Sequence, residues 1–290
     1  MTWFFLSLLT ALAVASQDAW VKKWFSCFNP FEMFVFPLLY SLPLTTAALF
    51  FIPAPPSLDA VFFWSFFVSL PLNAVPFILY MKAIRISPLS LTLPYLAFTP
   101  VFMIATGFVF LDEMPDKWGV SGIFAVCAGS YVLHLDTRRH SVFAPFRAMF
   151  GEKGSGIMLL VAFIFSFSSV IGKVAIMHSS VMFFQMWFFA VLSVLLAIIF
   201  SLTGSIRLKR ALDFPVRSAV AGLLLFAQIL FHGFAISMTK AVYMISIKRL
   251  SVVFGVIYGG LFFNEENIPM RLAGSLIMFS GAALILLKAG

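Results

Sequence analysis

Two adjacent cations, Lys248 and Arg249, stand in a mostly apolar run over 244–263. On insertion scales, a charge at the centre of a bilayer costs about 2.5–3.5 kcal/mol, so the pair requires compensation. A guanidinium beside an ammonium suits a phosphate or a carboxylate, because both groups donate charge-assisted hydrogen bonds. The pair is therefore either a binding site for an anionic substrate or a structural pair neutralised within the protein.

Asp18 is the one acid that we expect inside an apolar span, and a single carboxylate does not neutralise both cations. Lys22 follows it by one helical turn, so Asp18 is either the partner of Lys22 or a carboxylate that binds a coupling proton. The remaining positive charge favours an anion supplied from outside the protein.

Four further polar residues are candidates for substrate contact. Lys173 and Lys22 lie near the ends of apolar stretches, where a lysine either contacts a ligand or extends to the membrane surface. Gln228 and His232 are four residues apart and share a helix face. They either line a cavity or form hydrogen bonds to a neighbouring helix.

Prolines and acids mark two other places. Pro94 and Pro100 kink their span and expose backbone carbonyls, which makes the adjacent Tyr95 a candidate cavity residue. Glu113 and Glu265 each precede an apolar stretch, where a carboxylate near a helix N-terminus is stabilising. We interpret both glutamates as structural.

We expect no catalytic residue, metal ligand or cofactor. Cys27 and Cys127 are too few for a thiolate metal site or a disulfide framework. The four histidines have no acids at metal-ligand spacing, and no nucleophile and base stand together. The sequence therefore argues against an enzyme.

The elements that position these residues are apolar. The chain is 62% hydrophobic and 10% charged over 290 residues, far from the composition of a soluble domain. Its apolar stretches predict an all-α polytopic membrane protein with ten transmembrane helices. We expect these spans near 2–21, 32–52, 60–81, 88–111, 118–135, 155–177, 180–202, 215–238, 241–263 and 268–288.

The second half of the chain repeats the first at a constant shift of 152 residues (235 − 83). The shared positions include Ala83 with Ala235, Phe102 with Phe254, Gly107 with Gly259, Glu113 with Glu265, Gly122 with Gly274 and Gly129 with Gly281. Five spans per half is an odd number, so the halves must insert in opposite orientations, the plan of many secondary transporters. We expect repeats over 1–137 and 154–290, joined by a basic cytoplasmic linker over 138–153.

Loop charges predict the orientation. Three lysines fall on one side of the membrane: Lys117, Lys240 and Lys288. Eleven cations fall on the other: Lys82, Arg85, Arg138, Arg139, Arg147, Lys153, Arg207, Lys209, Arg210, Arg217 and Arg271. By the positive-inside bias the crowded side is cytoplasmic, so both termini face outward. The net charge of +8 therefore indicates membrane topology and lipid headgroup contacts, and no nucleic-acid partner is expected.

The stretch LPYLAFTPVFMIATGFVFLDEMPDKWGVSGIFAVCAGSYVL, with its counterpart in the second half, resembles the EamA-type drug/metabolite transporter superfamily. The resemblance covers essentially the whole chain. It implies ten spans in two inverted five-helix halves and translocation of a small molecule by alternating access.

Within that superfamily, IKRLSVV is similar to the ninth-span motif of the plastid triose-phosphate/phosphate translocators. In that family the adjacent cations grip the substrate's phosphate, which implies this role for Lys248 and Arg249. The family also has a lysine four residues before a span-four proline. Here that position is Leu96, before Pro100, so one cationic contact is missing.

The sequence thus predicts a secondary transporter for a small anionic metabolite, phosphorylated or carboxylated, in a bacterial inner membrane. One alternative is an exporter of neutral or zwitterionic metabolites such as amino acids. A more distant one is a lipid-handling membrane protein. We expect a proton or counter-substrate as coupling partner, and either a monomer or a homodimer.

Overall fold

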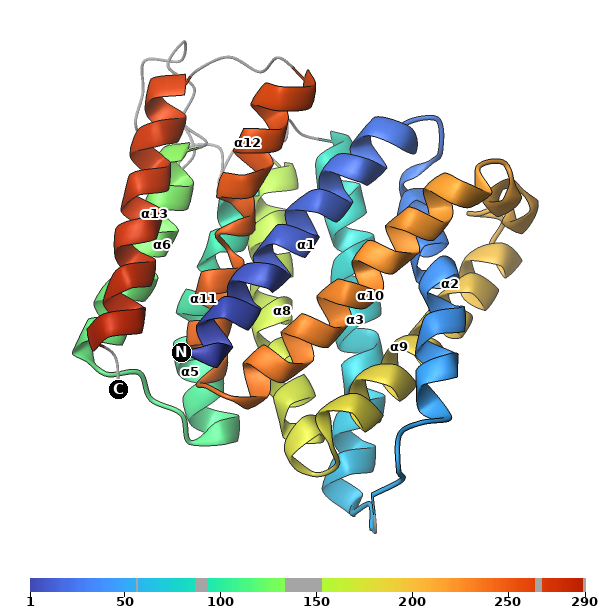
Figure 1. Cartoon of the computed structure of the whole chain (residues 1–290), viewed down its shortest axis with the longest axis horizontal. Coiled ribbons are helices and arrows are strands. Elements are labelled where there is room, and N and C mark those ends of the chain that lie inside the picture. The colour runs from blue at the N-terminus through green and yellow to red at the C-terminus, as the bar shows by residue number, and fades with distance from the viewer. Residues whose placement is uncertain (56, 87–92, 134–152, 264–267, 289–290) are drawn as a thin grey trace.

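The computed structural model describes residues 1–55, 57–86, 93–133, 153–263 and 268–288, which are helical and contain no strand (Figure 1). The first half contains α1 (Thr2–Trp24), α2 (Pro30–Leu49), α3 (Ala60–Ile86), the 3-10 helix η1 (Leu93–Phe98), α5 (Thr99–Leu111) and α6 (Lys117–Leu133). The second half contains α8 (Lys153–Met177), α9 (Val181–Leu202), the 3-10 helix η2 (Leu208–Leu212), α10 (Pro215–Ser237), α11 (Ala241–Lys248), α12 (Ser251–Phe263) and α13 (Ile268–Lys288).

These helices form the ten expected spans, and the all-α membrane fold is confirmed. Within the described ranges, six helices are long and apolar enough to cross a bilayer on their own: α1, α2, α3, α8, α9 and α10. Two of the remaining spans are interrupted. η1 precedes α5 in the fourth span, and α11 is separated from α12 in the ninth.

The shift of 152 residues is visible in the helix boundaries. Adding 152 to the bounds of α5, 99–111, gives 251–263, which are the bounds of α12. The contacts repeat as well, because α3 packs against α8 as α10 packs against α1, and α5 packs against α8 as α12 packs against α1. The predicted repeat boundaries themselves stay a prediction, because most of the linker, residues 134–152, lies outside the described residues.

The two halves run in opposite directions. The ring of Phe31, in the first turn of α2, lies 5.0 Å from the ring of Phe200, near the end of α9. Since α2 and α9 occupy equivalent places in the two halves, their antiparallel packing shows that one half is inverted relative to the other.

Paired glycines bring the last helices of the two halves together. α6 and α13 lie side by side in Figure 1. A Cβ added to Gly122 would meet the Gly281 carbonyl oxygen at 2.7 Å, and a Cβ added to Gly129 would meet that of Gly274 at 2.7 Å. Only glycine therefore allows this backbone-to-backbone contact.

Candidate functional site

The ninth span breaks at the predicted pair of cations. α11 ends at Lys248, Arg249 is its C-cap, and α12 begins at Ser251. The chain stays tightly wound through the break, since the Arg249 N–H donates to the Ile245 carbonyl at 3.1 Å and the Leu250 N–H donates to that of Ile247 at 3.0 Å. Discontinuous helices are typical of transporter binding sites, and here the break carries two half-buried cations.

Arg249 is positioned by the first half of the protein. Its Nη2 donates to Thr99 Oγ1 at 2.8 Å, and Thr99 is the buried first residue of α5. The Thr99 hydroxyl in turn donates to the Leu96 carbonyl at 2.7 Å. The two interrupted spans therefore meet at the predicted site, one from each half.

Lys248 lies near titratable side chains of two other helices. Its ammonium lies within electrostatic range of Asp18 on α1 and of His232 on α10. Tyr80 on α3 lies within electrostatic range of Asp18 and Arg249. We call these five residues, Asp18, Tyr80, His232, Lys248 and Arg249, the charged cluster.

The charged cluster keeps an excess of positive charge. Neither Lys248 nor Arg249 forms an ion pair with a carboxylate within the part of the chain that the structure describes. Two further donor or acceptor atoms, Arg249 Nε and His232 Nδ1, are buried with no hydrogen-bond partner among the described residues. Asp18 has the opposite character: its side chain is exposed although helices surround it. Unpartnered polar atoms and exposed charge in one place suit a ligand or water.

Two members of the site were missed by sequence reasoning. Tyr80 and Thr99 are neutral, and neither costs much in an apolar span, so neither stands out. The 152-residue repeat could have identified both residues from the sequence. Shifted by 152, Tyr80 coincides with His232 and Thr99 coincides with Ser251, the first residue of α12.

Lys173 lies elsewhere, with partners of its own. It is 5% exposed and forms an ion pair with Glu113, and its Nζ also donates to the Thr239 carbonyl at 2.5 Å. The other Glu113 oxygen, Oε2, accepts from the Ala241 N–H at 2.7 Å. We call Glu113, Lys173, Thr239 and Ala241 the Glu113 cluster. Because Lys173 already has a carboxylate, we leave it out of the anion site.

The remaining candidates occupy three environments. Tyr95 is buried, forms a hydrogen bond with Ser155, and packs in a cluster with α3 and α8 residues rather than in the charged cluster. Lys22 is exposed in the last turn of α1. Gln228 is half-buried on α10, one turn before His232. Glu265, His134 and His140 lie outside the described residues.

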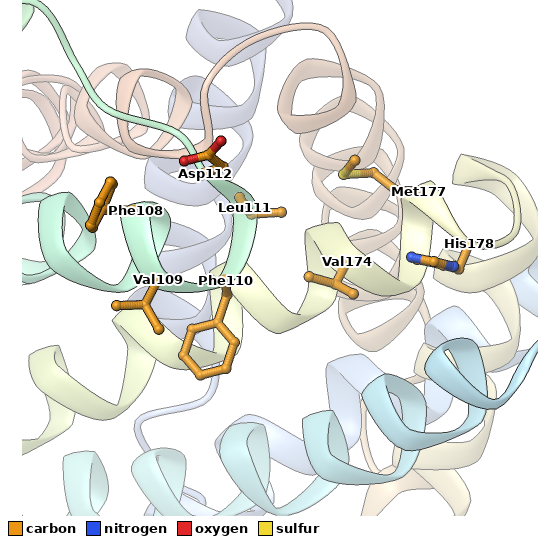
Figure 2. Close-up of a pocket in the computed structure, with 8 residues that line it drawn as sticks. All are labelled: Phe108, Val109, Phe110, Leu111, Asp112, Val174, Met177 and His178. Atoms are coloured by element: carbon orange, nitrogen blue, oxygen red, sulfur yellow. The ribbon is translucent and has the colours of Figure 1, made fainter.

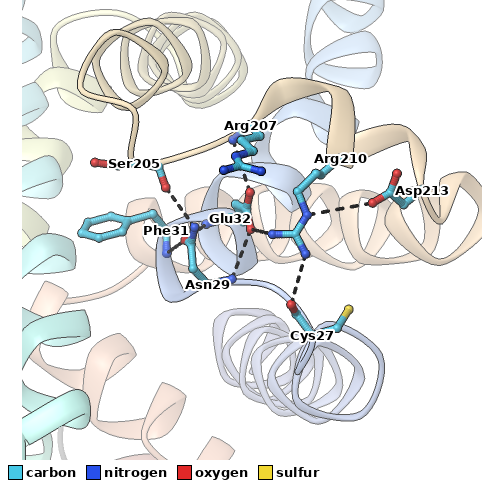
Figure 3. A network of polar contacts seen from close by, with 8 residues as sticks. All are labelled: Cys27, Asn29, Phe31, Glu32, Ser205, Arg207, Arg210 and Asp213. Carbon is cyan, nitrogen blue, oxygen red and sulfur yellow. Dashed lines mark hydrogen bonds and ion pairs between the residues drawn. The ribbon is translucent and has the colours of Figure 1, made fainter.

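A second polar network ties the halves together at the α1–α2 end of the molecule (Figure 3). Glu32 is fully buried and pairs with Arg210 at 2.7 Å, while the Arg207 N–H donates to its other oxygen at 3.2 Å. Asn29 caps α2 in a reciprocal capping box with Glu32, and its amide donates to the Ser205 carbonyl at 2.9 Å. These bonds fix α2 to the α9–α10 connection.

A surface pocket of about 440 Å³ lies between the ends of α5 and α8 (Figure 2), and no residue of the charged cluster lines it. It is lined mostly by apolar residues, with Asp112 and His178 as polar members. His178 Nδ1 lies 2.6 Å from Asp59 Oδ2. A hydrogen bond from the Phe62 N–H, together with His178, holds the pKa of the Asp59 carboxyl below its usual value. In the described residues, no group of three or more His, Cys, Asp or Glu side chains is placed to hold a metal.

Comparisons with known proteins agree with this architecture. Residues 1–135 match the model of the EamA-like transporter family. Twenty-nine solved chains match the fold. One of them, described only as "Crystal structure of protein", has a TM-score of 0.72 at 15% identity and covers 98% of this chain and 95% of its own.

No curated protein matches the chain. Because the structural match is only 15% identical, it shows the fold alone. The family match covers residues 1–135, less than half of the chain. The first half is therefore similar to the EamA-like transporter family, and the described residues of the whole chain include six helices long and apolar enough to span a membrane.

Proposed function

We propose that the protein is a secondary transporter that moves a small anionic metabolite across the membrane by alternating access, with Lys248 and Arg249 binding the anionic group. The observation that carries this proposal is the excess positive charge at the break between α11 and α12. Two cations with no direct carboxylate partner in the described residues are stabilised when an anion enters.

The geometry suits a phosphate or carboxylate group. Arg249 has one nitrogen on Thr99 and a buried Nε without a partner in the described residues, so it keeps a donor for the ligand. Lys248 supplies a second charge from the adjacent residue, and His232 Nδ1 supplies a further polar atom. A phosphate ester fits the resemblance of this motif to the triose-phosphate/phosphate translocators, while Leu96, in place of their lysine, favours a less highly charged anion.

A second candidate is a zwitterionic metabolite such as an amino acid. The observation that favours it is the exposed Asp18 carboxylate within electrostatic range of Lys248. A ligand that has both charges would place its ammonium at Asp18 and its carboxylate at Lys248 and Arg249. In the first proposal, by contrast, Asp18 is a coupling carboxylate that binds a proton.

The test is counterflow in liposomes with phosphate esters, carboxylates and amino acids. Charge-assisted hydrogen bonds are worth about 1.5–3 kcal/mol, so Lys248→Ala or Arg249→Ala should weaken anion binding about 10- to 150-fold. Lys209→Ala, which removes an exposed cation outside the spans, is the matched control and should transport normally. Undiminished transport by both site variants would contradict the assignment.

Asp18→Asn separates the two candidates. It should abolish amino-acid counterflow if the ligand is zwitterionic. It should leave anion exchange intact, while removing any proton dependence, if Asp18 is the coupling group.

We further propose a bacterial inner-membrane location with both termini outside. The support is the loop charge: Arg207, Lys209 and Arg210 lie in the α9–α10 connection, at the end of the molecule opposite to the start of α1 and the end of α13 (Figure 1).

A further inference from the structure

We propose that Glu113 and Lys173 form a gate that closes the transport path at the α5–α6 end, and that α11 connects this gate to the charged cluster. The inference rests on the proposed transport function in one respect, the existence of a path. It assigns a moving role to two residues that sequence reasoning treated as structural or as substrate-binding.

The Glu113 cluster joins the two halves. Glu113 lies in the turn between α5 and α6 of the first half, and it pairs with Lys173 on α8 of the second. The same carboxylate accepts from the Ala241 N–H, at the start of α11, at 2.7 Å. Separation of the halves at this end therefore requires these bonds to break.

Two neighbouring hydrogen bonds connect the same two halves. Lys240 Nζ donates to the Met114 carbonyl at 2.9 Å, and the Asp116 N–H donates to the Tyr243 hydroxyl at 3.2 Å. Each bond joins the α5–α6 turn to the start of α11. Since these contacts are polar, water can replace them when the end opens, whereas apolar packing would have no such substitute.

α11 is a short rigid connection between gate and site. It runs from Ala241, bound to Glu113, to Lys248 in the charged cluster, a length of about 12 Å at 1.5 Å per residue. Its residues Ala241–Ile247 are all buried. A helix packed on every side moves as a unit, so a displacement of Lys248 by a bound anion displaces the N-terminus that Glu113 holds.

Shifted by 152, Lys173 coincides with Val21, which precedes Lys22 in the last turn of α1, and Glu113 coincides with Glu265, which lies outside the described residues. At the opposite end, the structure describes a polar network built from Glu32 and Arg210, on α2 and the α9–α10 connection. That network serves as a control for the gate.

The experiment measures the opening of the α5–α6 end with paired spin labels. Cys27 is replaced by Ser and Cys127 by Ala, and labels are placed at Met114→Cys and Met238→Cys, which are both exposed and lie on either side of the Glu113 cluster. Without ligand we expect mainly one short distance. Glu113→Gln, which keeps an acceptor for Ala241 but loses the ion pair, should move much of the population to longer distances.

Two matched variants test the cause. Lys173→Arg preserves the ion pair and should preserve the short distance. Glu32→Gln removes the ion pair at the opposite end and should also preserve it. Should Glu113→Gln fail to fold, the double variant Glu113→Gln, Lys173→Met, which buries no lone charge, should show the same opening. An unchanged distance distribution in a folded, monodisperse variant would overturn the gate.

Addition of inorganic phosphate tests the link through α11. We expect phosphate to change the label distance in the otherwise unaltered protein and to have no effect in Lys248→Ala. A gate that opens in Glu113→Gln but ignores phosphate would remove the link and count against the anion proposal, while the gate itself would stand.

Discussion

At the scale of single residues, the charged cluster is held in place by neutral groups. Arg249 is oriented by the Thr99 hydroxyl at 2.8 Å, and Tyr80 lies within electrostatic range of the same guanidinium. A cation whose direction is fixed in advance loses less side-chain freedom when it binds a ligand. Thr99 is thus a positioning residue for the proposed site.

Thr99→Val should raise the apparent KM for the transported anion about tenfold, because Arg249 loses a hydrogen bond of about 1.5 kcal/mol or more. Valine has nearly the same shape, so the thermal unfolding temperature should change little. Thr99→Ser retains the hydroxyl and serves as the control in the same counterflow assay. Equal KM values for valine and serine variants would show that Thr99 does not orient Arg249.

The residue scale also shows the limit of sequence reasoning. Lys248 and Arg249 were evident because buried charge is expensive, and the structure places them together with Asp18 and His232. The pairing of Lys173 with Glu113 spans 60 residues of sequence and has no local signature. The sequence left Lys173 as either a ligand contact or a surface lysine and interpreted Glu113 as structural, because the choice of partner is made by tertiary packing.

At the scale of elements, the apolar stretches and the shift of 152 were sufficient to predict ten spans and two repeats. The break between α11 and α12 was not predicted. No proline or glycine occurs between residues 241 and 254, so the local sequence contains no helix breaker. The interruption coincides instead with the bond from Arg249 to Thr99, a contact between the two halves.

Glycines at the α6–α13 contact give a prediction at this scale. Gly281→Ala would place a Cβ 2.7 Å from the Gly122 carbonyl oxygen, so the helices must separate, at about 1–3 kcal/mol of stability. Gly255→Ala, on α12, meets nothing within 4 Å and should be neutral or slightly stabilising. Thermal unfolding in detergent, followed by intrinsic fluorescence, compares the two. Equal melting temperatures would contradict the close contact.

At the scale of the whole molecule, the two halves are joined by polar networks at both ends. The Glu113 cluster joins the halves at the α5–α6 end. The Glu32–Arg210 network of Figure 3 joins them at the opposite end, between α2 and the α9–α10 connection. The start of α1 and the end of α13 lie toward the same end of the molecule (Figure 1), as an even number of spans requires. The positive-inside bias then predicts which end faces the cytoplasm.

Thiol labelling tests that orientation. Cys27 is exposed at the end that we expect to be cytoplasmic, so a membrane-impermeant maleimide should label it only in broken cells. In a Cys27→Ser background, Met114→Cys lies at the opposite end and should react in intact cells. The reverse pattern would invert the proposed orientation without affecting the fold.

The glycine contacts between α6 and α13 have a mechanical consequence. Where two backbones touch with no side chains between them, the helices cannot approach further, and any separation loses the whole contact. Gly122 with Gly281 and Gly129 with Gly274 fix two points on one line. Both points lie along the length of the paired helices, so we expect α6 and α13 to stay together while other contacts between the halves change.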